Sequence, residues 1–332
     1  MNKPAAVQLG DGLAVSPLGF GGMALTPAYG EVDLAGALRT LHHAVDTGMT
    51  FIDTADVYGS GSNEELIAQL LRERRDEVQL ATKFGIVDGP AGGRPDVRGD
   101  AAYVNQAVDR SLKRLGTDII DLYYVHRRDL RIPMAETVEA LAGLVTAGKV
   151  RHLGLSEVTA EELREANSVH PIAAVQSEWS IWSRDVERHV VPAAAELGVG
   201  FVPYSPLGRG FLTGTVDTST MGTSDFRRTI PRFAEAALEA NQGVVAAVRS
   251  VATELEATPA QVALAWLLVQ GRQRGLSVVP IPGTRKAARI DENLGALALD
   301  LTPTQLERLD AAENVVVGSR SADSNFVSEG RE

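Results

Sequence analysis

The sequence predicts an α/β protein whose strands and helices close into one (β/α)8 barrel, the TIM-barrel architecture. Strand-like and helix-like segments alternate eight times along the 332 residues. The strand candidates are continuous apolar runs instead of alternating apolar and polar residues, which is typical of parallel strands buried on both faces. No change of composition, linker or low-complexity segment divides the chain, so residues 1–332 are expected to form a single domain.

The expected elements follow one another in a regular order. A β-hairpin is expected first, over residues 7–15, because Asp11-Gly12 supplies a tight turn between two short apolar arms. Lying before the first barrel strand, it would plug the bottom of the barrel. The eight strands are expected at Leu18–Gly21, Thr50–Asp53, Val78–Thr82, Ile120–Val125, Val150–Leu155, Ala173–Ser177, Gly200–Tyr204 and Ser277–Ile281. The helices between them are expected at Asp33–Thr47, Asn63–Arg74, Ala101–Leu115, Pro133–Ala147, Ala160–Asn167, Asp185–Leu197, Ala234–Leu255 and Lys286–Leu294.

Two further helices do not fit the eightfold repeat. They are expected at Pro259–Gly271 and Pro303–Asn314, each with threonine as N-cap and proline at the first helical position. We expect both to be additions outside the barrel ring. Asn63 is the expected N-cap of the helix that follows the second strand.

Three irregular segments remain. The loops over residues 85–99 and 205–232 are longer than barrel connections require, and such loops usually carry function. The tail after Val317 is polar and is expected to be mobile.

Composition excludes several classes of function. The chain has 32 basic and 43 acidic residues, a net charge of -11 that disfavours nucleic-acid and anionic-membrane partners. It contains no apolar run long enough to span a bilayer and no apolar signal-peptide core near Met1. The absence of cysteine excludes disulfides and thiol chemistry and fits a cytoplasmic protein. No metal site is predicted, and the sequence leaves a monomer and a homo-oligomer equally open.

Reactive side chains follow three consecutive strands. Asp53 ends the second strand, Lys83 follows the third, and His126 follows the fourth, while Tyr58 lies on the Gly/Ser-rich loop just after Asp53. Taken singly, each could be an ion-pair partner or a loop-capping group. Because all strand carboxyl ends open on one face of a barrel, where catalytic residues collect, the four are predicted to converge on one pocket.

These four residue types suggest proton donation to a carbonyl. A free tyrosine has a pKa of about 10 and is a weak acid at neutral pH. A nearby Lys83 ammonium would favour the phenolate of Tyr58, with Asp53 holding that charge in place and His126 aligning the carbonyl. Reduction of a carbonyl also needs a hydride, which no side chain supplies, so a nicotinamide cofactor is implied.

Six segments carry a resemblance to a known family. They read FIDTADVYGSGSNEELI, ATKFG, DLYYVHRRD, GKVRHLGLSE, VPYSPLGRGFLTG and PIPGTRKAARIDEN, in family order and spacing over nearly the whole chain. Together they resemble the aldo-keto reductases, most closely the microbial and plant branch with perakine-reductase-like and auxin-induced-type members. The resemblance implies reversible reduction of aldehydes or ketones with NADP(H), and a catalytic tetrad of Asp53, Tyr58, Lys83 and His126.

The resemblance also implies where the cofactor binds. It would extend across the barrel mouth without a Rossmann fold, and no G-x-G-x-x-G follows any strand. The implied contacts to the nicotinamide end are Gly22, Met23, Asp53, Ser156, Gln176 and Tyr204, of which Tyr204 would stack on the ring. The implied pyrophosphate cover is Ser205, Pro206, Leu207, Gly208, Gly210 and Phe211.

Basic residues after the eighth strand predict NADP(H) instead of NAD(H). Cations near a helix N-terminus are disfavoured unless an anion is expected there, and helix N-termini are natural phosphate sites. By resemblance, the segment from Gly283 with Thr284, Arg285 and Arg289 would hold the 2′-phosphate. Glu292 and Asn293 would then contact the adenine.

Two points remain open within this interpretation. The family often has Ser-Asn after strand five, where this chain has Ser156-Glu157. An ionised carboxylate only accepts hydrogen bonds, so it could bind the carboxamide NH2 but not its oxygen, and the role of Glu157 stays undetermined. The substrate candidates are Tyr29, Phe84, Trp179 and Trp182, of which the tryptophans could equally be core residues.

Two other functions compete with a reductase. One is a nucleotide-binding regulatory protein on the same fold, like the potassium-channel β subunits. The other is a barrel glycosidase with Asp53 and Glu178 as its two carboxylates, in which Lys83 and Tyr58 would have no natural role. The physiological substrate and reaction direction are not readable from the sequence.

Overall fold

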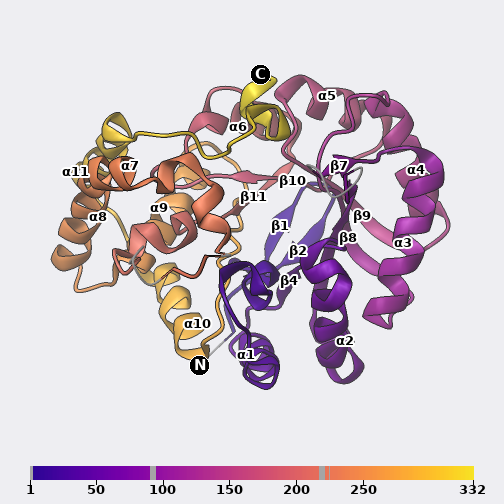
Figure 1. Cartoon of the computed structure of the whole chain (residues 1–332), viewed down its shortest axis with the longest axis horizontal. Coiled ribbons are helices and arrows are strands. Elements are labelled where there is room, and N and C mark those ends of the chain that lie inside the picture. Colours follow the sequence, from indigo (N-terminus) through magenta and orange to yellow (C-terminus); the bar gives the residue numbers. More distant parts are fainter. Residues whose placement is uncertain (1–2, 90–94, 217–220, 224) are drawn as a thin grey trace.

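A parallel sheet of seven strands curves into a barrel with helices around it (Figure 1). The computed structural model describes residues 3–89, 95–216, 221–223 and 225–332. In sheet order the strands are β3 (Phe20–Gly21), β4 (Phe51–Asp53), β5 (Gln79–Phe84), β8 (Ile120–Val125), β9 (Val150–Ser156), β10 (Ala174–Glu178) and β11 (Gly200–Tyr204). Each lies within a few residues of its predicted position.

Residues 277–282 occupy the eighth strand position and close the barrel. The segment hydrogen-bonds to β11 through Val279 and Ile281 on one side. On the other side its carbonyls accept from the N–H groups of Gly19, just before β3, and of Gly21 within β3. Two of its residues are Pro280 and Pro282, which have no N–H to donate toward β3. The predicted strand at 277–281 is therefore reduced to an isolated bridge, although the predicted (β/α)8 barrel is confirmed.

The predicted N-terminal hairpin plugs the barrel. Its arms are β1 (Val7–Leu9) and β2 (Leu13–Val15), paired antiparallel. Leu9, Leu13 and Val15 belong to a buried cluster with the inward-facing residues of the strands. At Gly200 a Cβ would lie 2.4 Å from Leu9 Cδ2, so only glycine lets the plug approach β11 this closely.

In the part of the chain that the structure describes, eight helices form the ring around the strands. They are α1 (Leu34–Asp46), α2 (Ser62–Arg74), α3 (Ala101–Leu115), α4 (Met134–Thr146), α5 (Ala160–Val169), α6 (Val190–Leu197), α9 (Pro259–Gln273) and α10 (Ala287–Leu294). Outside the ring are α7 (Glu235–Ala240), α8 (Gln242–Glu254) and α11 (Pro303–Ala311). In the described residues no helix has both the length and the apolar character needed to cross a membrane.

The ring assignment corrects one expectation. The sequence predicts the segment at 234–255 in the ring and the α9 helix outside it, but α9 packs against α10, which packs against α1. The predicted helix at 234–255 also breaks at Asn241 into α7 and α8. Because α8 and α11 cover its outer face, α9 is buried on nearly all sides, including Trp266. Among the described residues, the helices outside the ring are thus α7, α8 and α11, one more than the two that the sequence predicts.

Asn63 is not the N-cap that the sequence predicts. Gly61 occupies the cap position of α2, and Asn63 lies inside the helix with 1% of its surface exposed. Its side chain accepts a hydrogen bond from Thr54 Oγ1 at 2.7 Å and donates to the Gly22 carbonyl at 3.0 Å. It therefore ties the carboxyl ends of β3 and β4 to α2.

The long segments carry short elements of their own. The predicted loop at 85–99 contains β6 (Ile86–Val87) and β7 (Asp96–Val97), which pair antiparallel. Residues 90–94 of this loop lie outside the described residues. The loop at 205–232 contains short 3-10 turns, and its residues 217–220 and 224 also lie outside the described part.

The polar tail differs from the expected mobile segment. It folds back onto the barrel beside α5 and α6 (Figure 1). Arg320, Val327 and Ser328 in this segment are at most 4% exposed. The tail is therefore packed in this structure.

Candidate active site

The carboxyl ends of neighbouring strands bring three of the predicted residues together. Lys83 Nζ donates to Asp53 Oδ1 and, at 2.8 Å, to the Thr54 carbonyl. Asp53, Lys83 and His126 are all at most 6% exposed. The β5 strand extends to Phe84, so Lys83 lies within the strand and points into the site instead of following it. The predicted convergence is therefore present.

Tyr58 completes the group from a short turn after β4. The turn at Tyr58–Gly61 contains left-handed backbone at Gly59 and Ser60, which reverses the chain within a few residues. The Tyr58 hydroxyl lies 3.5 Å from Lys83 Nζ. Its ring meets the His126 ring edge-on, with centroids 5.8 Å apart. The phenol thus lies between the ammonium and the imidazole.

Burial and the neighbouring charges act on the pKa values of Tyr58 and Lys83 in opposite directions. It raises the pKa of Tyr58 above its usual value, while Lys83 lowers that pKa and Asp53 raises it. Burial lowers the pKa of Lys83, but Asp53 and Tyr58 raise it by more. The expected acidification of Tyr58 by Lys83 is therefore outweighed in this structure, where the phenol keeps its proton and Lys83 keeps its charge.

His126 is a neutral imidazole. Burial holds its pKa well below the usual value, and the cations Arg127 and Lys83 lower it further. Its Nδ1 is buried and has no hydrogen-bond partner within the described residues. A neutral ring can donate from one nitrogen and accept at the other, which suits orientation of a polar ligand group.

A cavity of about 880 Å³ opens at the barrel mouth. Asp53, Tyr58 and His126 line one part of it, and Lys83 lies behind Asp53. The other predicted residues that line it are Met23, Tyr29, Ser156, Gln176, Tyr204, Ser205, Pro206, Leu207, Gly210, Gly283, Thr284, Arg285, Arg289, Glu292 and Asn293. The cavity therefore joins the tetrad to the start of α10.

Three predicted cofactor residues lie behind the cavity wall. A Cβ at Gly22 would lie 2.6 Å from the Asp53 carbonyl, and one at Gly208 would lie 2.6 Å from Trp182 Nε1. Phe211 stacks on Trp182, with ring centroids 4.4 Å apart. These residues shape the site by packing, and they do not border its cavity.

The aromatic substrate candidates separate into two groups. Tyr29 lines the cavity. Phe84 stacks on Tyr123, and Trp179 packs against Trp266, while Trp182 is covered by Phe211. A buried ring outside the cavity lining cannot contact a substrate there, so in this structure Phe84, Trp179 and Trp182 are core residues.

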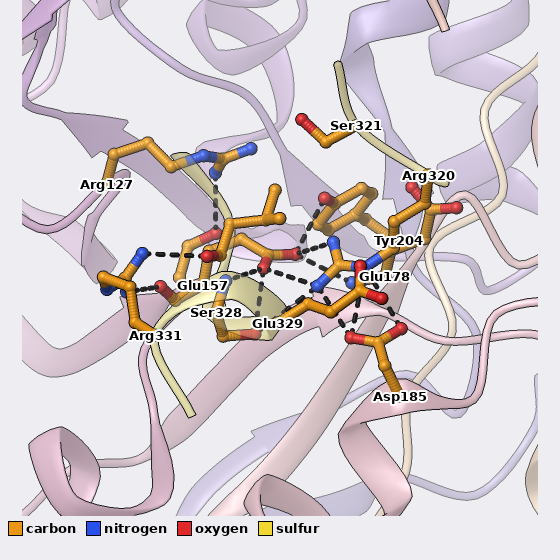
Figure 2. A network of polar contacts seen from close by, with 12 residues as sticks. Arg127, Glu157, Glu178, Asp185, Tyr204, Arg320, Ser321, Ser328, Glu329 and Arg331 are labelled. Atoms are coloured by element: carbon orange, nitrogen blue, oxygen red, sulfur yellow. Dashed lines mark hydrogen bonds and ion pairs between the residues drawn. The ribbon is translucent and has the colours of Figure 1, made fainter. Parts of the chain in front are cut away.

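The predicted carboxamide contacts are already oriented. Gln176 Nε2 donates to Asp53 Oδ2 at 2.9 Å, and Ser156 Oγ accepts from Arg127 Nη1 at 3.3 Å. Glu157 does not line the cavity, because Tyr204 and the C-terminal segment engage its carboxylate (Figure 2).

The basic residues at the start of α10 differ in what their side chains contact. Arg285 donates to the carbonyls of Ala24, Thr26, Gly30 and Glu31 at 2.7–3.1 Å. Its guanidinium is thereby occupied in fastening residues 24–31 to the end of the eighth strand. Arg289 pairs with Glu292 and is half exposed, and Lys286 also lines the cavity.

Several residues of the cavity wall are not among those predicted from the sequence. Arg127 lies in the same motif as His126, and Arg209 lies in the loop predicted to cover the cofactor, so both had a local signal. Arg209 donates to Glu178 at 3.0 Å and to Tyr29 at 3.3 Å. Phe326 also lines the cavity, but it comes from the polar tail, which carried no signal.

The carboxylates of the glycosidase alternative are both engaged. Asp53 is bound by Lys83 and Gln176. Glu178 is 2% exposed, is bound by Arg209 and does not line the cavity. A free carboxylate pair of the glycosidase kind is therefore not formed by Asp53 and Glu178.

Comparison with known proteins defines the class as a barrel oxidoreductase. The chain belongs to the aldo/keto reductase family, whose sequence description matches residues 17–314. It is 44% identical over 321 residues to probable aldo-keto reductase 1 from Glycine max, covering 95% of this chain and 91% of that protein.

Two solved structures share the fold. A glycerol dehydrogenase from Gluconobacter oxydans matches with a TM-score of 0.82 and 26% identity, over 94% of this chain and 95% of that one. An aldo-keto reductase from Bacillus halodurans, in its holo form, matches with a TM-score of 0.72 and 25% identity, over 97% and 99%. With an oxidoreductase family established, the regulatory-subunit alternative is not favoured.

The cavity fits a nicotinamide dinucleotide. One part is bordered by the Tyr204 ring and the amide of Gln176, and the other by the cationic Lys286 and Arg289. A molecule with a flat ring at one end and anionic groups at the other is complementary to this arrangement.

Proposed function

We propose that this protein catalyses the reversible, NADP(H)-dependent reduction of aldehydes or ketones to alcohols. The observation that supports it most strongly is the group formed by Tyr58, Lys83 and Asp53, with neutral His126 beside it, in a cavity that reaches the basic start of α10. When bound, the nicotinamide supplies the hydride.

Tyr58 acts as the general acid in the direction of reduction. Its hydroxyl holds a proton at neutral pH because burial raises its pKa. Once that proton passes to the carbonyl oxygen, the phenolate is stabilised by Lys83 Nζ, 3.5 Å away in the resting structure. Asp53 keeps Lys83 charged and fixed, so the acid and its counter-charge are preorganised.

His126 orients the carbonyl. Because its pKa is well below the usual value, it remains neutral over the working pH range and does not compete as the acid. Its ring meets Tyr58 edge-on and borders the same cavity. A hydrogen bond from that ring would hold the carbonyl oxygen toward the phenol.

Residues along the cavity would hold the cofactor. Tyr204 would lie against the nicotinamide ring, with Ser156 and Gln176 at its amide. The pyrophosphate would lie against the loop from Ser205 to Gly210, and the adenine against Glu292 and Asn293. The 2′-phosphate would contact Thr284, Lys286 and Arg289, whereas Arg285 fastens the neighbouring loop and acts indirectly.

The Tyr58→Phe variant tests the proposal. It keeps the ring and removes only the hydroxyl, so kcat should fall by about 10²–10⁴-fold. NADPH affinity, measured by fluorescence titration, should stay within about threefold, because the hydroxyl serves the carbonyl and not the cofactor. Tyr103→Phe, whose ring packs against Phe84 outside the cavity lining, is the matched control. A Tyr58→Phe enzyme that reduces a good aldehyde within threefold of the parent rate would show that another group supplies the proton.

A further inference from the structure

Glu157 is bound by partners from distant parts of the chain. It follows Ser156 at the carboxyl end of β9, has a left-handed φ of 53° and is fully buried. Its carboxylate accepts from Tyr204 Oη at 2.8 Å and from the Glu178 backbone N–H at 3.2 Å. It also accepts from both Nη atoms of Arg320 at 2.9 and 3.0 Å, and from the N–H and Oγ of Ser328 at 2.9 and 3.1 Å (Figure 2).

These contacts use the whole carboxylate. An ionised carboxylate offers about four lone-pair sites, and Glu157 accepts more hydrogen bonds than that. Burial raises its pKa, but Arg320 and then Arg127 lower it by more, so the group stays ionised. Glu157 has no free acceptor for a ligand, which answers the question left open by the sequence.

The C-terminal segment, residues 318–332, is anchored at both ends. Arg320 has 1% of its side chain exposed and also binds Asp185 at 2.9 Å. Near the end of the chain, Arg331 donates to the Glu157 carbonyl at 2.6 Å and pairs with Glu162 at 3.1 Å. Buried charges persist only where partners satisfy them, so these pairs differ from ordinary surface ion pairs.

Phe326 lies between the anchors and reaches the cavity. Its ring centroid is 5.1 Å from Cζ of Arg127. Arg127 in turn donates to the His126 carbonyl at 2.7 Å. The anchored segment therefore puts an aromatic ring beside Arg127, the residue that follows His126, at the wall of the cavity.

We propose that Glu157 and Arg320 are positioning residues that latch residues 318–332 onto the barrel mouth, which makes Phe326 a specificity-determining residue for the carbonyl substrate. The latch is inferred from the hydrogen bonds and ion pairs of Glu157 and Arg320 and needs no assumption about activity. The specificity role of Phe326 rests on the proposed function. The same carboxylate also holds the Tyr204 hydroxyl, so the latch and the proposed nicotinamide face share one anchor.

Hydrogen exchange of the C-terminal peptide tests the latch without any substrate. In Arg320→Ala and in Glu157→Gln, amides of residues 318–332 should exchange at least about tenfold faster than in the parent protein, since ordered contacts protect amides. The strand peptides should remain protected. Arg164→Ala, which removes an exposed ion pair to Glu196, should leave the tail unchanged.

Unchanged hydrogen exchange in the tail would overturn the latch. A folded Arg320→Ala protein whose tail is protected as in the parent would overturn the latch. Because an unpaired buried Glu157 could prevent folding, the double variant Glu157→Gln/Arg320→Met removes both charges together. Its tail should exchange as fast as in the single variants, and parent-like protection in it would also overturn the latch.

Substrate kinetics test the role of Phe326. In Phe326→Ala, KM for an aromatic aldehyde such as 4-nitrobenzaldehyde should rise by about 3–10-fold, the range expected for a lost aromatic contact. The kcat for that aldehyde and the KM for propanal should change by less than about twofold. Arg320→Ala should shift the ratio of the two KM values in the same direction. An unchanged ratio in Phe326→Ala would overturn its specificity role, while the Tyr58→Phe result bears only on the proton donor.

Discussion

Lys83 determines the charge balance of the site. Its ammonium and the Asp53 carboxylate are both almost fully buried, so each depends on the other. Lys83→Met should abolish measurable turnover and lower the free energy of unfolding by about 3–5 kcal/mol, the usual cost of leaving one buried charge without its partner. Lys149→Met is the matched control, because its pair with Asp109 is partly exposed and should be worth at most about 1 kcal/mol.

Urea unfolding and steady-state rates measure both effects. A Lys83→Met protein as stable as the Lys149→Met control would mean that Asp53 is not an ionised partner of Lys83. The electrostatic part of the proposed mechanism would then need another source.

Asp56 should make stability depend on pH. Burial and then Glu64 raise the pKa of Asp56 to about 7, against the lowering effects of Arg114 and Arg110. Its Oδ1 has no hydrogen-bond partner within the described residues. Since the folded pKa exceeds the unfolded value of about 3.9, the folded state binds the extra proton between these values. The contribution of Asp56 to stability is therefore present below about pH 4 and is lost as the pH rises to 7.

The Asp56→Asn variant isolates this contribution. The stability of the variant relative to the parent should increase from pH 4 to pH 7, with a slope of at most about 1.4 kcal/mol per pH unit, and level off above pH 8. Urea unfolding at pH 4.5, 6, 7 and 8 gives the curve. Parallel curves for parent and variant would show that Asp56 titrates normally.

At the residue scale, a site residue is predictable from the sequence where its chemistry and its position at a strand end coincide. Asp53, Lys83 and His126 are unusual residues to place at the ends of apolar strands, and the barrel geometry then predicts their meeting. The roles of Glu157 and Phe326 are not predictable in this way. Arg320, the ion-pair partner of Glu157, lies 163 residues later, and both Arg320 and Phe326 belong to a tail without an apolar pattern. A contact of that separation leaves no trace in local periodicity.

The hairpin plug should contribute stability without contributing to catalysis. Leu9 is fully buried and contacts the base of the barrel, while the tetrad lies at the opposite, carboxyl-terminal end. Leu9→Ala should lower the free energy of unfolding by about 2–5 kcal/mol, as for other large-to-small core changes. Gln8→Ala, on the exposed face of the same strand, should change it by less than about 0.5 kcal/mol.

Measuring kcat distinguishes the structural end of the barrel from the catalytic end. Under conditions where both proteins are folded, Leu9→Ala should keep the parent kcat. A large fall in kcat together with unchanged stability would contradict the assignment of the hairpin to the structural end.

At the scale of elements, the misassignments have identifiable physical causes. Pro280 and Pro282 remove the donors of a regular eighth strand, although the segment still closes the barrel. The sequence predicts the α9 helix outside the ring because α9 does not fit the simple alternation of strands and helices. In the structure α9 is buried on nearly all sides, since α8 and α11 cover it from outside. Asn63 has a good capping side chain, but Gly61 adopts the left-handed cap and frees Asn63 to join two strands.

Arg285 and Arg289 should have separable effects on the cofactor. Arg285 is a fastener between residues 24–31 and the barrel, so Arg285→Ala should raise KM for NADPH and NADH by similar factors. Arg289 has only Glu292 as an ion-pair partner within the described residues and lines the cavity. Arg289→Ala should raise KM for NADPH alone, by about 10–100-fold, as for a lost hydrogen bond to a charged group.

Equal effects of Arg289→Ala on both cofactors would remove Arg289 from the phosphate contact. A selective loss of NADPH in Arg285→Ala would instead mean that its guanidinium leaves the four carbonyls when the cofactor binds.

Over the whole molecule, the net charge of -11 opposes the binding of an anionic dinucleotide. Affinity must therefore come from the local cations at the start of α10, whose fields are screened within about 10 Å at moderate salt. A preference for the 2′-phosphate should then depend on one or two side chains instead of on the overall charge. Cofactor-induced stabilisation of the whole fold provides a test that needs no substrate.

A ligand that binds only the folded state stabilises it by about 2.7 kcal/mol at 100 times its Kd. At equal concentrations NADPH should therefore raise Tm by several degrees, and NADH by less, because it lacks the phosphate that Lys286 and Arg289 would bind. In Arg289→Ala the NADPH shift should fall toward the NADH shift, with Lys286 keeping part of the difference, whereas Tyr58→Phe should keep the full difference. Arg39→Ala, which breaks an exposed pair with Asp33, controls for the loss of one surface charge. Equal shifts for the two cofactors in the parent protein would refute the NADP(H) preference and leave the proposed proton transfer by Tyr58 untouched.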